Sequence, residues 1–314
     1  MRASVVIPTY NRPQELENCL RSLARQTVLP WEIVVIDDGD LPGMPLHDKL
    51  TALGIRCVFE RKDTPGLVAS RNLGAVVANG EVVFYLDDDV VLFPDYIERI
   101  LACFDLPEQP LGVGGLIENI RPMTPGRLAQ YLLQVLCNAS GLREGRVLAS
   151  GFTTDYGTTP FPLHDTTRVD YLSGGVCAFK REVFHGPGLR FSDAFRSLSG
   201  YSQGEDKEFS YRVSQHGALL VEPRAKLYHY EAPKTGYDKR AKGRAVALSR
   251  FYFLRDTVRP RPWRWAAFWL ALSGYTLIRV LAVLAGGGRS EWHRVQGLAG
   301  AIRDILLHRT GGHL

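Results

Sequence analysis

Short apolar runs rich in Val and Ile alternate with stretches of helical periodicity through the first part of the chain, and this alternation constrains the fold most strongly. It predicts an α/β fold with a mostly parallel, Rossmann-like sheet that is covered by helices on both faces. Ligands of such sheets bind beyond the carboxyl ends of the strands, so we expect the chemistry in the loops that follow the strands. The expected strands are Ser4–Ile7, Glu32–Ile36, Ile55–Glu60 and Val82–Leu86, and the expected helices are Pro13–Arg25, with Asn11 and Arg12 as its cap, and Ser70–Val77.

The middle of the chain has weaker patterns. Residues 107–165 are rich in Gly, Pro and Thr, which predicts loops and short elements around one helical stretch at Leu128–Leu136. A second ordered block follows. Its expected elements are a strand at Val169–Phe179, a helical turn at Arg181–Phe184, a helix at Glu205–His216 and a strand at Ala218–Val221.

Charge is distributed unevenly along the 314 residues. Counting Lys and Arg against Asp and Glu gives −7 for residues 1–222 and +12 for residues 223–314, which together make the net charge of +5. The basic tail suits an anionic lipid or a phosphorylated ligand, whereas no zinc-finger spacing or aromatic RNA-binding signature points to nucleic acid. Five scattered cysteines without a CxxC pair argue against disulfides and fit a cytoplasmic location, and the strand-like start of the chain predicts no export signal.

The tail contains a strongly apolar segment, Trp263–Ala285, that Arg279 interrupts. Only 14 residues, Trp265–Ile278, precede that charge, and a membrane-spanning helix needs about 20 apolar residues, so we do not expect a full crossing. Tryptophans at the start and several arginines before it suit a helix lying in an anionic lipid interface. The alternative is a C-terminal helical hairpin that packs on the catalytic core.

Three adjacent carboxylates, Asp87, Asp88 and Asp89, follow the apolar strand Val82–Leu86. Carboxylates beside a buried strand are electrostatically costly unless a positive group lies among them. A divalent cation, Mn²⁺ or Mg²⁺, would fill that role and would leave coordination positions for the phosphates of a nucleotide. A solvated acidic turn is the alternative.

Three further loops carry polar residues that could meet a nucleotide. Asp38 at the end of the second strand could accept from a base or a ribose hydroxyl, although Asp-Gly pairs also mark ordinary turns. Tyr10 and Arg12 offer an aromatic ring and a cation after the first strand, or simply lead into the helix. The helix that carries Arg71 could direct its amino end at an anion, or its glycines could serve close packing.

Two residues further along the chain are candidates for catalysis and metal binding. Asp206 at the start of a helix could act as a general base towards an acceptor hydroxyl, or it could only favour the helix dipole. His229 in a strand-like aromatic run could supply a metal ligand, although a single histidine is more often structural.

Taken together, these motifs resemble family 2 glycosyltransferases of the GT-A fold over about residues 3–232. The resemblance implies a catalytic domain at 1–232, with a nucleotide-binding half at 1–106 and an acceptor half at 107–232. The remaining residues, 233–314, are expected to form a basic and apolar helical extension, for which composition suggests membrane association. Asp40 departs from the serine that is common after the Asp-Asp-Gly turn. The motifs are Val5–Arg12, Glu32–Gly39, Ser70–Gly74, Asn79–Glu81, Asp87–Asp89 and Gly204–Asp206.

The resemblance also implies roles for single residues. Asp206 takes the place of the catalytic base, and Asp89 with His229 would bind Mn²⁺ or Mg²⁺. Gly174, Gly175 and Glu205 would border the donor sugar and the acceptor. The residues expected at the nucleotide and donor are Pro8, Thr9, Tyr10, Arg12, Asp38, Arg71, Asp87 and Asp88.

The resulting functional prediction is an inverting transfer of a sugar from a nucleoside diphosphate sugar to a hydroxyl of a glycan or a lipid-linked acceptor, at the cytoplasmic face of a membrane. One rival is a nucleotidyltransferase, which would release pyrophosphate and ordinarily needs a Gly-rich basic loop after the first strand. The other is a membrane-associated scaffold without activity, which would have lost Asp89 or Asp206, and both are present.

Overall fold

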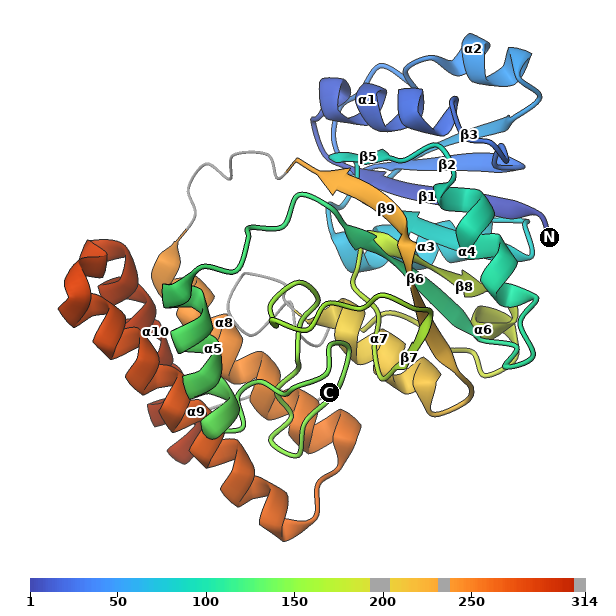
Figure 1. Cartoon of the computed structure of the whole chain (residues 1–314). Helices are drawn as coiled ribbons and strands as arrows, with labels where there is room; N and C mark the ends of the chain where they lie inside the picture. Colours follow the sequence, from blue (N-terminus) through green and yellow to red (C-terminus); the bar gives the residue numbers. More distant parts are fainter. Residues whose placement is uncertain (193–203, 231–237, 308–314) are drawn as a thin grey trace. The chain divides into compact units, whose positions relative to one another are not determined.

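The structure, a computed structural model, describes residues 1–192, 204–230 and 238–307 (Figure 1). The chain divides into two compact units. The sheet unit consists of Met1–Ile120, Leu163–Phe191 and Phe209–Pro233, and the helical unit consists of Arg121–Pro162, Ser192–Glu208 and Lys234–Leu314. The division does not follow chain order, since a middle segment groups with the C-terminal helices. The predicted domain bounds, 1–232 and 233–314, stay a prediction.

The sheet unit is built on one mixed sheet of order β3-β2-β1-β4-β8-β6-β9-β5, with β7 paired to β9. The first four strands along the chain are parallel to one another, as the alternating pattern predicts, whereas β8 runs antiparallel to both β4 and β6. The strands are β1 Ala3–Thr9, β2 Glu32–Asp37, β3 Arg56–Arg61, β4 Val82–Leu86, β5 Val90–Leu92, β6 Gly112–Ile117, β7 Thr167–Val169, β8 Val176–Lys180 and β9 Leu219–His229.

Helices cover both faces of this sheet, as predicted. Side chains alternate along β1, so that Val5 and Ile7 pack with α1 and α4 in the main core, while Val6 faces α3. A Cβ added to Gly74 of α3 would lie 2.2 Å from Cγ1 of Val6, so the glycine permits the close approach of this helix. The helices of the unit are α1 Pro13–Leu23, α2 His47–Ala52, α3 Leu67–Val77, α4 Tyr96–Phe104 and α6 Glu182–His185, and α7 Glu205–Ser214 enters it at Phe209.

Two local predictions were wrong. The expected strand Val169–Phe179 is two strands, β7 and β8, because Gly175 adopts a left-handed backbone conformation (φ 72°) that interrupts the extended run. The expected cap of α1 is also absent: Arg12 stands at the N-cap without a side-chain hydrogen bond, while the proline at the first position is as predicted.

The helical unit contains α5 Pro125–Leu136, α8 Lys239–Tyr252, the π-helix η2 Phe253–Val258, α9 Pro262–Ala282, the π-helix η3 Val283–Gly287 and α10 Gly288–Leu306. Within the described residues, the helical run Pro262–Leu306 is long and apolar enough to cross a membrane, judged by length and composition, but Gly286 (φ 92°) breaks the helical conformation between α9 and α10. Helices α8 and α10 approach closely. A Cβ on Gly297 would lie 2.0 Å from the backbone oxygen of Arg240, and one on Gly243 would lie 2.2 Å from that of Arg294.

This contact predicts a sharp difference between two glycines of α10. Gly297→Ala forces backbone apart and should lower the free energy of unfolding by about 1–3 kcal/mol. Gly300→Ala meets no atom within 4 Å, and its gain in helix propensity should raise stability by about 0.5–1 kcal/mol. Urea denaturation followed by circular dichroism measures both, and equal effects of the two variants would contradict the packing.

Candidate functional site

The strand order of the sheet unit brings three chain segments to one edge. Strand β1 lies between β2 and β4, so the direction in which strands are added reverses there, and ligands of open α/β sheets bind at such a point. Thr9 ends β1, and Asp87 directly follows β4. Strand β9 joins them because it pairs antiparallel with β5, with His229 opposite Val90.

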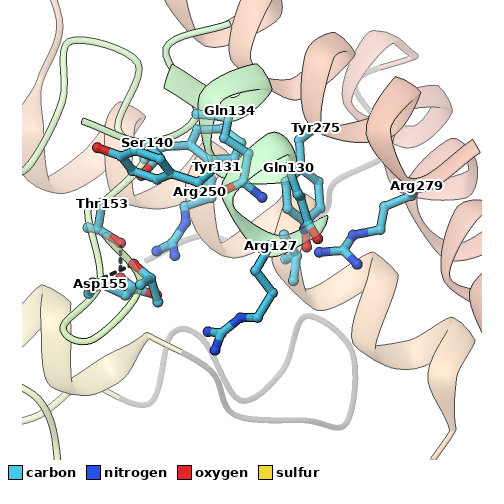
Figure 2. A pocket seen from close by; sticks show the side chains of 14 residues that line it. Arg127, Gln130, Tyr131, Gln134, Ser140, Thr153, Asp155, Arg250, Tyr275 and Arg279 are labelled. Atoms are coloured by element: carbon cyan, nitrogen blue, oxygen red, sulfur yellow. Dashed lines mark hydrogen bonds between the residues drawn. The ribbon is translucent and has the colours of Figure 1, made fainter. Parts of the chain in front are cut away.

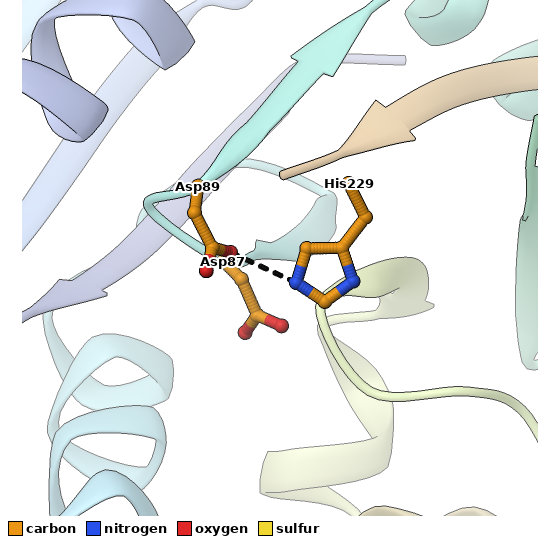
Figure 3. Close-up of side chains that lie close together, drawn as sticks. All are labelled: Asp87, Asp89 and His229. Carbon is orange, nitrogen blue, oxygen red and sulfur yellow. Dashed lines mark ion pairs between the residues drawn. The ribbon is translucent and has the colours of Figure 1, made fainter. Parts of the chain in front are cut away.

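Asp87, Asp89 and His229 converge at this edge (Figure 3). One ligand atom from each lies within 4.8 Å of the others. The imidazole Nε2 of His229 lies 2.9 Å from Oδ1 of Asp89, and the backbone N–H of Tyr230 donates to the carbonyl of Asp89 at 2.9 Å. Asn119 exchanges two hydrogen bonds of 2.9 Å with the backbone of His229, which holds the end of β9 in place.

This group has the composition of a cation site. Carboxylate oxygens and one imidazole nitrogen are ligands that Mn²⁺ accepts, and carboxylates also suit Mg²⁺. The three side chains are close enough to bind one ion without a change of backbone. Two carboxylates supply the negative charge that a divalent cation would neutralise, so the residues fit the ion that the sequence predicts.

Asp88 is directed to different partners from its two neighbours. Its carboxylate accepts a hydrogen bond of 2.8 Å from Thr9 Oγ1 and one of 3.0 Å from Arg12 Nη1. Arg12 also reaches Asp89 at 3.3 Å. Burial raises the pKa of Asp88 to about 6, against the opposing effects of Thr9 and Arg12, so the group is a carboxylate at neutral pH.

Asp87 is oriented by Arg71, whose Nη2 lies 3.5 Å from its Oδ1. Arg71 is buried, its guanidinium lies over the ring of Phe191, and its backbone oxygen accepts from the hydroxyl of Tyr85. Gly175 lies on the other side of Asp87, where an added Cβ would come within 2.1 Å of the carboxylate. Arg71 and Gly175 are therefore placed to position Asp87.

Asp38 connects the end of β2 to the start of α3. Its carboxylate accepts from the backbone N–H of Gly66 at 2.9 Å and from Ser70 Oγ at 2.7 Å. It also pairs with Lys62 Nζ at 2.8 Å. The neighbouring Asp37 closes the turn by accepting from the backbone of residues 39 and 41.

The loop after β1 contacts the loop after β2 through Asn11. Its Oδ1 accepts from the backbone N–H of Asp40 at 3.0 Å, and an added Cβ on Gly39 would lie 2.1 Å from the same oxygen. Asp40 in place of the common serine therefore leaves this contact intact, because only the backbone N–H of residue 40 takes part in it. In the same loop Pro8 is buried within β1 while the ring of Tyr10 is 57% exposed.

The remaining candidates lie elsewhere in the chain. Glu205 and Asp206 begin α7 in the helical unit, where Glu205 is buried and Asp206 is half-buried. Gly174 precedes Gly175 in the turn before β8. Roles in binding nucleotide, donor sugar or acceptor stay predictions for all of the residues named in the sequence.

Sequence patterns did not indicate three supporting residues. Lys62 neutralises Asp38, Asn119 fixes the strand end at His229, and Phe191 packs against Arg71. Lys62 and Asn119 lie in segments without a motif, and each acts across a long sequence separation. Their roles are visible only in the three-dimensional structure, where distant segments of the chain come into contact.

Comparison with known proteins gives a consistent result. Residues 4–127 match the family described as Glycosyl transferase family 2. Validoxylamine A glucosyltransferase from Streptomyces hygroscopicus subsp. limoneus is 29% identical over 248 residues, which cover 73% of this chain and 51% of that protein. Chondroitin synthase from Escherichia coli is 27% identical over 263 residues, covering 78% and 37%. The chain thus spans about half or less of the length of these relatives.

Solved structures share the fold at low sequence identity. A mannosyltransferase from Pyrobaculum calidifontis, in complex with GDP-Man and Mn²⁺, has a TM-score of 0.56 and 18% identity, with coverage of 98% of this chain and 88% of that one. Residues 1–349 of S. aureus TarS give a TM-score of 0.52 and 16% identity, with coverage of 99% and 92%. Family match, relatives and fold agree: residues 4–127 form a domain of glycosyltransferase family 2, and the chain has the GT-A fold.

Proposed function

We propose that the protein is an inverting, metal-dependent glycosyltransferase that moves a sugar from a nucleoside diphosphate sugar to an acceptor hydroxyl. The observation that carries the proposal is the group Asp87, Asp89 and His229 at the switch point of the sheet. A family 2 fold with a cation site beyond β4 suits a donor with a diphosphate leaving group. A structural neighbour in complex with GDP-Man and Mn²⁺ supports this choice of donor class.

Each residue has a distinct task in the proposed reaction. Asp89, His229 and Asp87 would hold Mn²⁺ or Mg²⁺, and the ion would neutralise charge on the departing diphosphate. Asp206 takes the proton from the acceptor hydroxyl as its oxygen attacks the anomeric carbon from the side opposite the leaving group. One base suffices for this inverting displacement.

The remaining predicted residues bind the donor and the acceptor. Tyr10 presents an exposed ring on which a base could stack. Asp38 and Asp88 lie near the nucleoside and ribose, and Glu205 contributes to the acceptor side. Arg71 and Gly175 keep Asp87 in place, as their contacts with its carboxylate support.

Replacing the base tests the mechanism. Asp206→Asn should lower kcat by about 10²–10⁴-fold, because the amide cannot accept the proton, while donor affinity stays unchanged. Turnover is measured by release of nucleoside diphosphate, and donor binding by calorimetry. Glu208→Gln removes the same charge from the same helical turn and should retain kcat within a few-fold. A near-normal rate for Asp206→Asn would refute the assignment.

Replacing a ligand tests the cation site. His229→Ala should weaken Mn²⁺ binding by about 10–100-fold, because the ion loses one ligand, and activity should recover at higher Mn²⁺ concentration. Calorimetric titration with Mn²⁺ alone measures the affinity. His47→Ala is the matched control, since His47 lies 3.2 Å from Asp48 in a pair that no third ligand completes among the described residues. Unchanged Mn²⁺ affinity in His229→Ala would remove the histidine from the site.

The helical unit has exposed apolar and basic residues that suit binding to an anionic membrane surface. The side chains of Arg127, Gln130, Tyr131 and Gln134 on helix α5 line a cavity within the helical unit. Leu132 and Leu136 of the same helix are 56% and 78% exposed. The neighbouring α9 exposes Leu270, Leu277 and Leu281 at helical spacing. Only 28% of its most apolar stretch is buried, which is low for a core helix. These exposed leucines, together with Arg259, Arg261 and the half-buried Arg264, support contact with lipid.

The apolar face gives a direct test. Leu136→Glu combined with Leu277→Glu should lower the fraction bound to vesicles containing phosphatidylglycerol by more than about tenfold, because each leucine contributes about 1.5–3 kcal/mol when it leaves water. Co-sedimentation measures binding. Val76→Glu changes a 62% exposed apolar residue of the sheet unit and should leave it unaltered. If the double variant sediments like the unaltered protein, the face is not a lipid contact.

A further inference from the structure

The helical unit contains a partly open cavity of about 280 Å³ that no residue of the proposed donor site lines (Figure 2). Its walls come from α5, from the loop between α5 and β7, and from α8 and α9. Polar side chains dominate the lining. They include Arg127, Thr153, Asp155, Arg250, Tyr275 and Arg279.

Three guanidinium groups line this one cavity. Arg127 and Arg250 have no carboxylate within ion-pair distance among the residues that the structure describes. Arg279 lies 3.5 Å from Glu291, but that carboxylate is closer to Arg294, at 2.7 Å. The cavity therefore has an excess of positive charge that its own residues do not balance.

Two arginines of the cavity lining also have Nε–H groups without an acceptor in the described part of the protein. Within the described part of the chain, no protein atom accepts a hydrogen bond from the buried Nε of Arg250 or from that of Arg279. Both guanidinium groups lie over aromatic rings, Phe152 and Tyr275, which fix their planes. These Nε atoms are themselves inaccessible, so a ligand in the cavity would meet the remaining nitrogens of the two fixed guanidinium planes, whose geometry matches the recognition of phosphate oxygens.

One acidic residue in the lining, Asp155, is already neutralised. Its carboxylate lies 2.6 Å from Lys207 Nζ and accepts from Thr153 Oγ1 at 2.8 Å. Burial alone would raise the pKa of Asp155, but Lys207 and Arg250 hold it well below its usual range, so it stays charged and paired. Lys207 follows Asp206 in the chain, and this ion pair therefore attaches the wall of the cavity to the first turn of α7.

We propose that this cavity binds a phosphate or diphosphate group of the acceptor, held by Arg127, Arg250 and Arg279. That the bound group belongs to an acceptor rests on the proposed function, because the proposed base Asp206 precedes Lys207, which pairs with Asp155 of the cavity lining. A phosphoryl group anchored there would bring a neighbouring sugar or alcohol hydroxyl towards the base. The cavity thus selects acceptors that carry a phosphoryl group.

The first experiment uses the full chain with EDTA, so that no divalent cation is present at the donor site. Pyrophosphate should bind, as measured by calorimetry, and both Arg250→Gln and Arg127→Gln should weaken it by about tenfold or more, since each removes a charge-assisted hydrogen bond. The half-buried Arg127 lies at the start of α5, so its replacement keeps the test valid if Arg250→Gln does not fold.

Two controls distinguish binding in this cavity from general charge attraction and from binding at the donor site. Arg289→Gln removes one positive charge from an exposed position of the same unit outside the cavity and should leave the affinity within about twofold. Asp89→Asn alters the donor site and should not change pyrophosphate affinity without metal. An equal loss in Arg289→Gln, or no binding by the unaltered protein, would overturn the proposal. An inactive Asp206→Asn variant that still binds pyrophosphate keeps the two proposals distinct.

A second arm identifies the source of the phosphoryl group. Vesicles with phosphatidic acid present a phosphate monoester, whereas vesicles with phosphatidylglycerol present only a diester. If the protein prefers vesicles with phosphatidic acid and Arg250→Gln abolishes that preference, the cavity binds a phosphate carried by a lipid. If Arg250→Gln changes only the binding of soluble pyrophosphate, the acceptor is soluble.

Discussion

Three consecutive carboxylates at the end of one buried strand are the constraint around which the sheet unit is built. The structure gives each carboxylate a main partner of its own, although Arg12 reaches both Asp88 and Asp89, and Asp87 and Asp89 both lie in the group with His229. Arg71 holds Asp87, Thr9 and Arg12 hold Asp88, and His229 meets Asp89. These partners arrive from several different segments of the chain, so β1, α3 and β9 must be in place before the charges are compensated. The proposed cation site therefore depends on the whole sheet.

The sequence predicted the parallel core well, because hydrophobic periodicity reports burial directly. Strands β1 to β4 and helices α1 and α3 were expected within a few residues of their bounds. It predicted less where local signals are weak or contradictory. Strand β6 is rich in glycine, and the turn at Gly175 lies within an apolar run. Asn119 and Lys62 carry no pattern of their own, since their roles depend on pairing across the fold.

In the tail, the sequence underestimates the length of the apolar surface that α9 offers. Arg279 interrupts the apolar segment in the sequence. It would end the apolar surface of the helix only if its side chain were on the outward face. In the structure it lines the cavity of the helical unit, lies over Tyr275 and is only 18% exposed. The outward face of α9 continues past it through Leu277 and Leu281, both exposed. The apolar surface offered by this helix is therefore longer than the distance between charges in the sequence suggests.

The contact between Asn11 and the backbone of Asp40 has a consequence for variation in this family of folds. The side chain at position 40 takes no part in joining the two loops, so selection on that junction acts on a backbone N–H alone. Any residue except proline supplies that donor. Position 40 is thus free to carry a charge, a hydroxyl or an apolar group beside the loops after β1 and β2, while the junction between those loops stays the same.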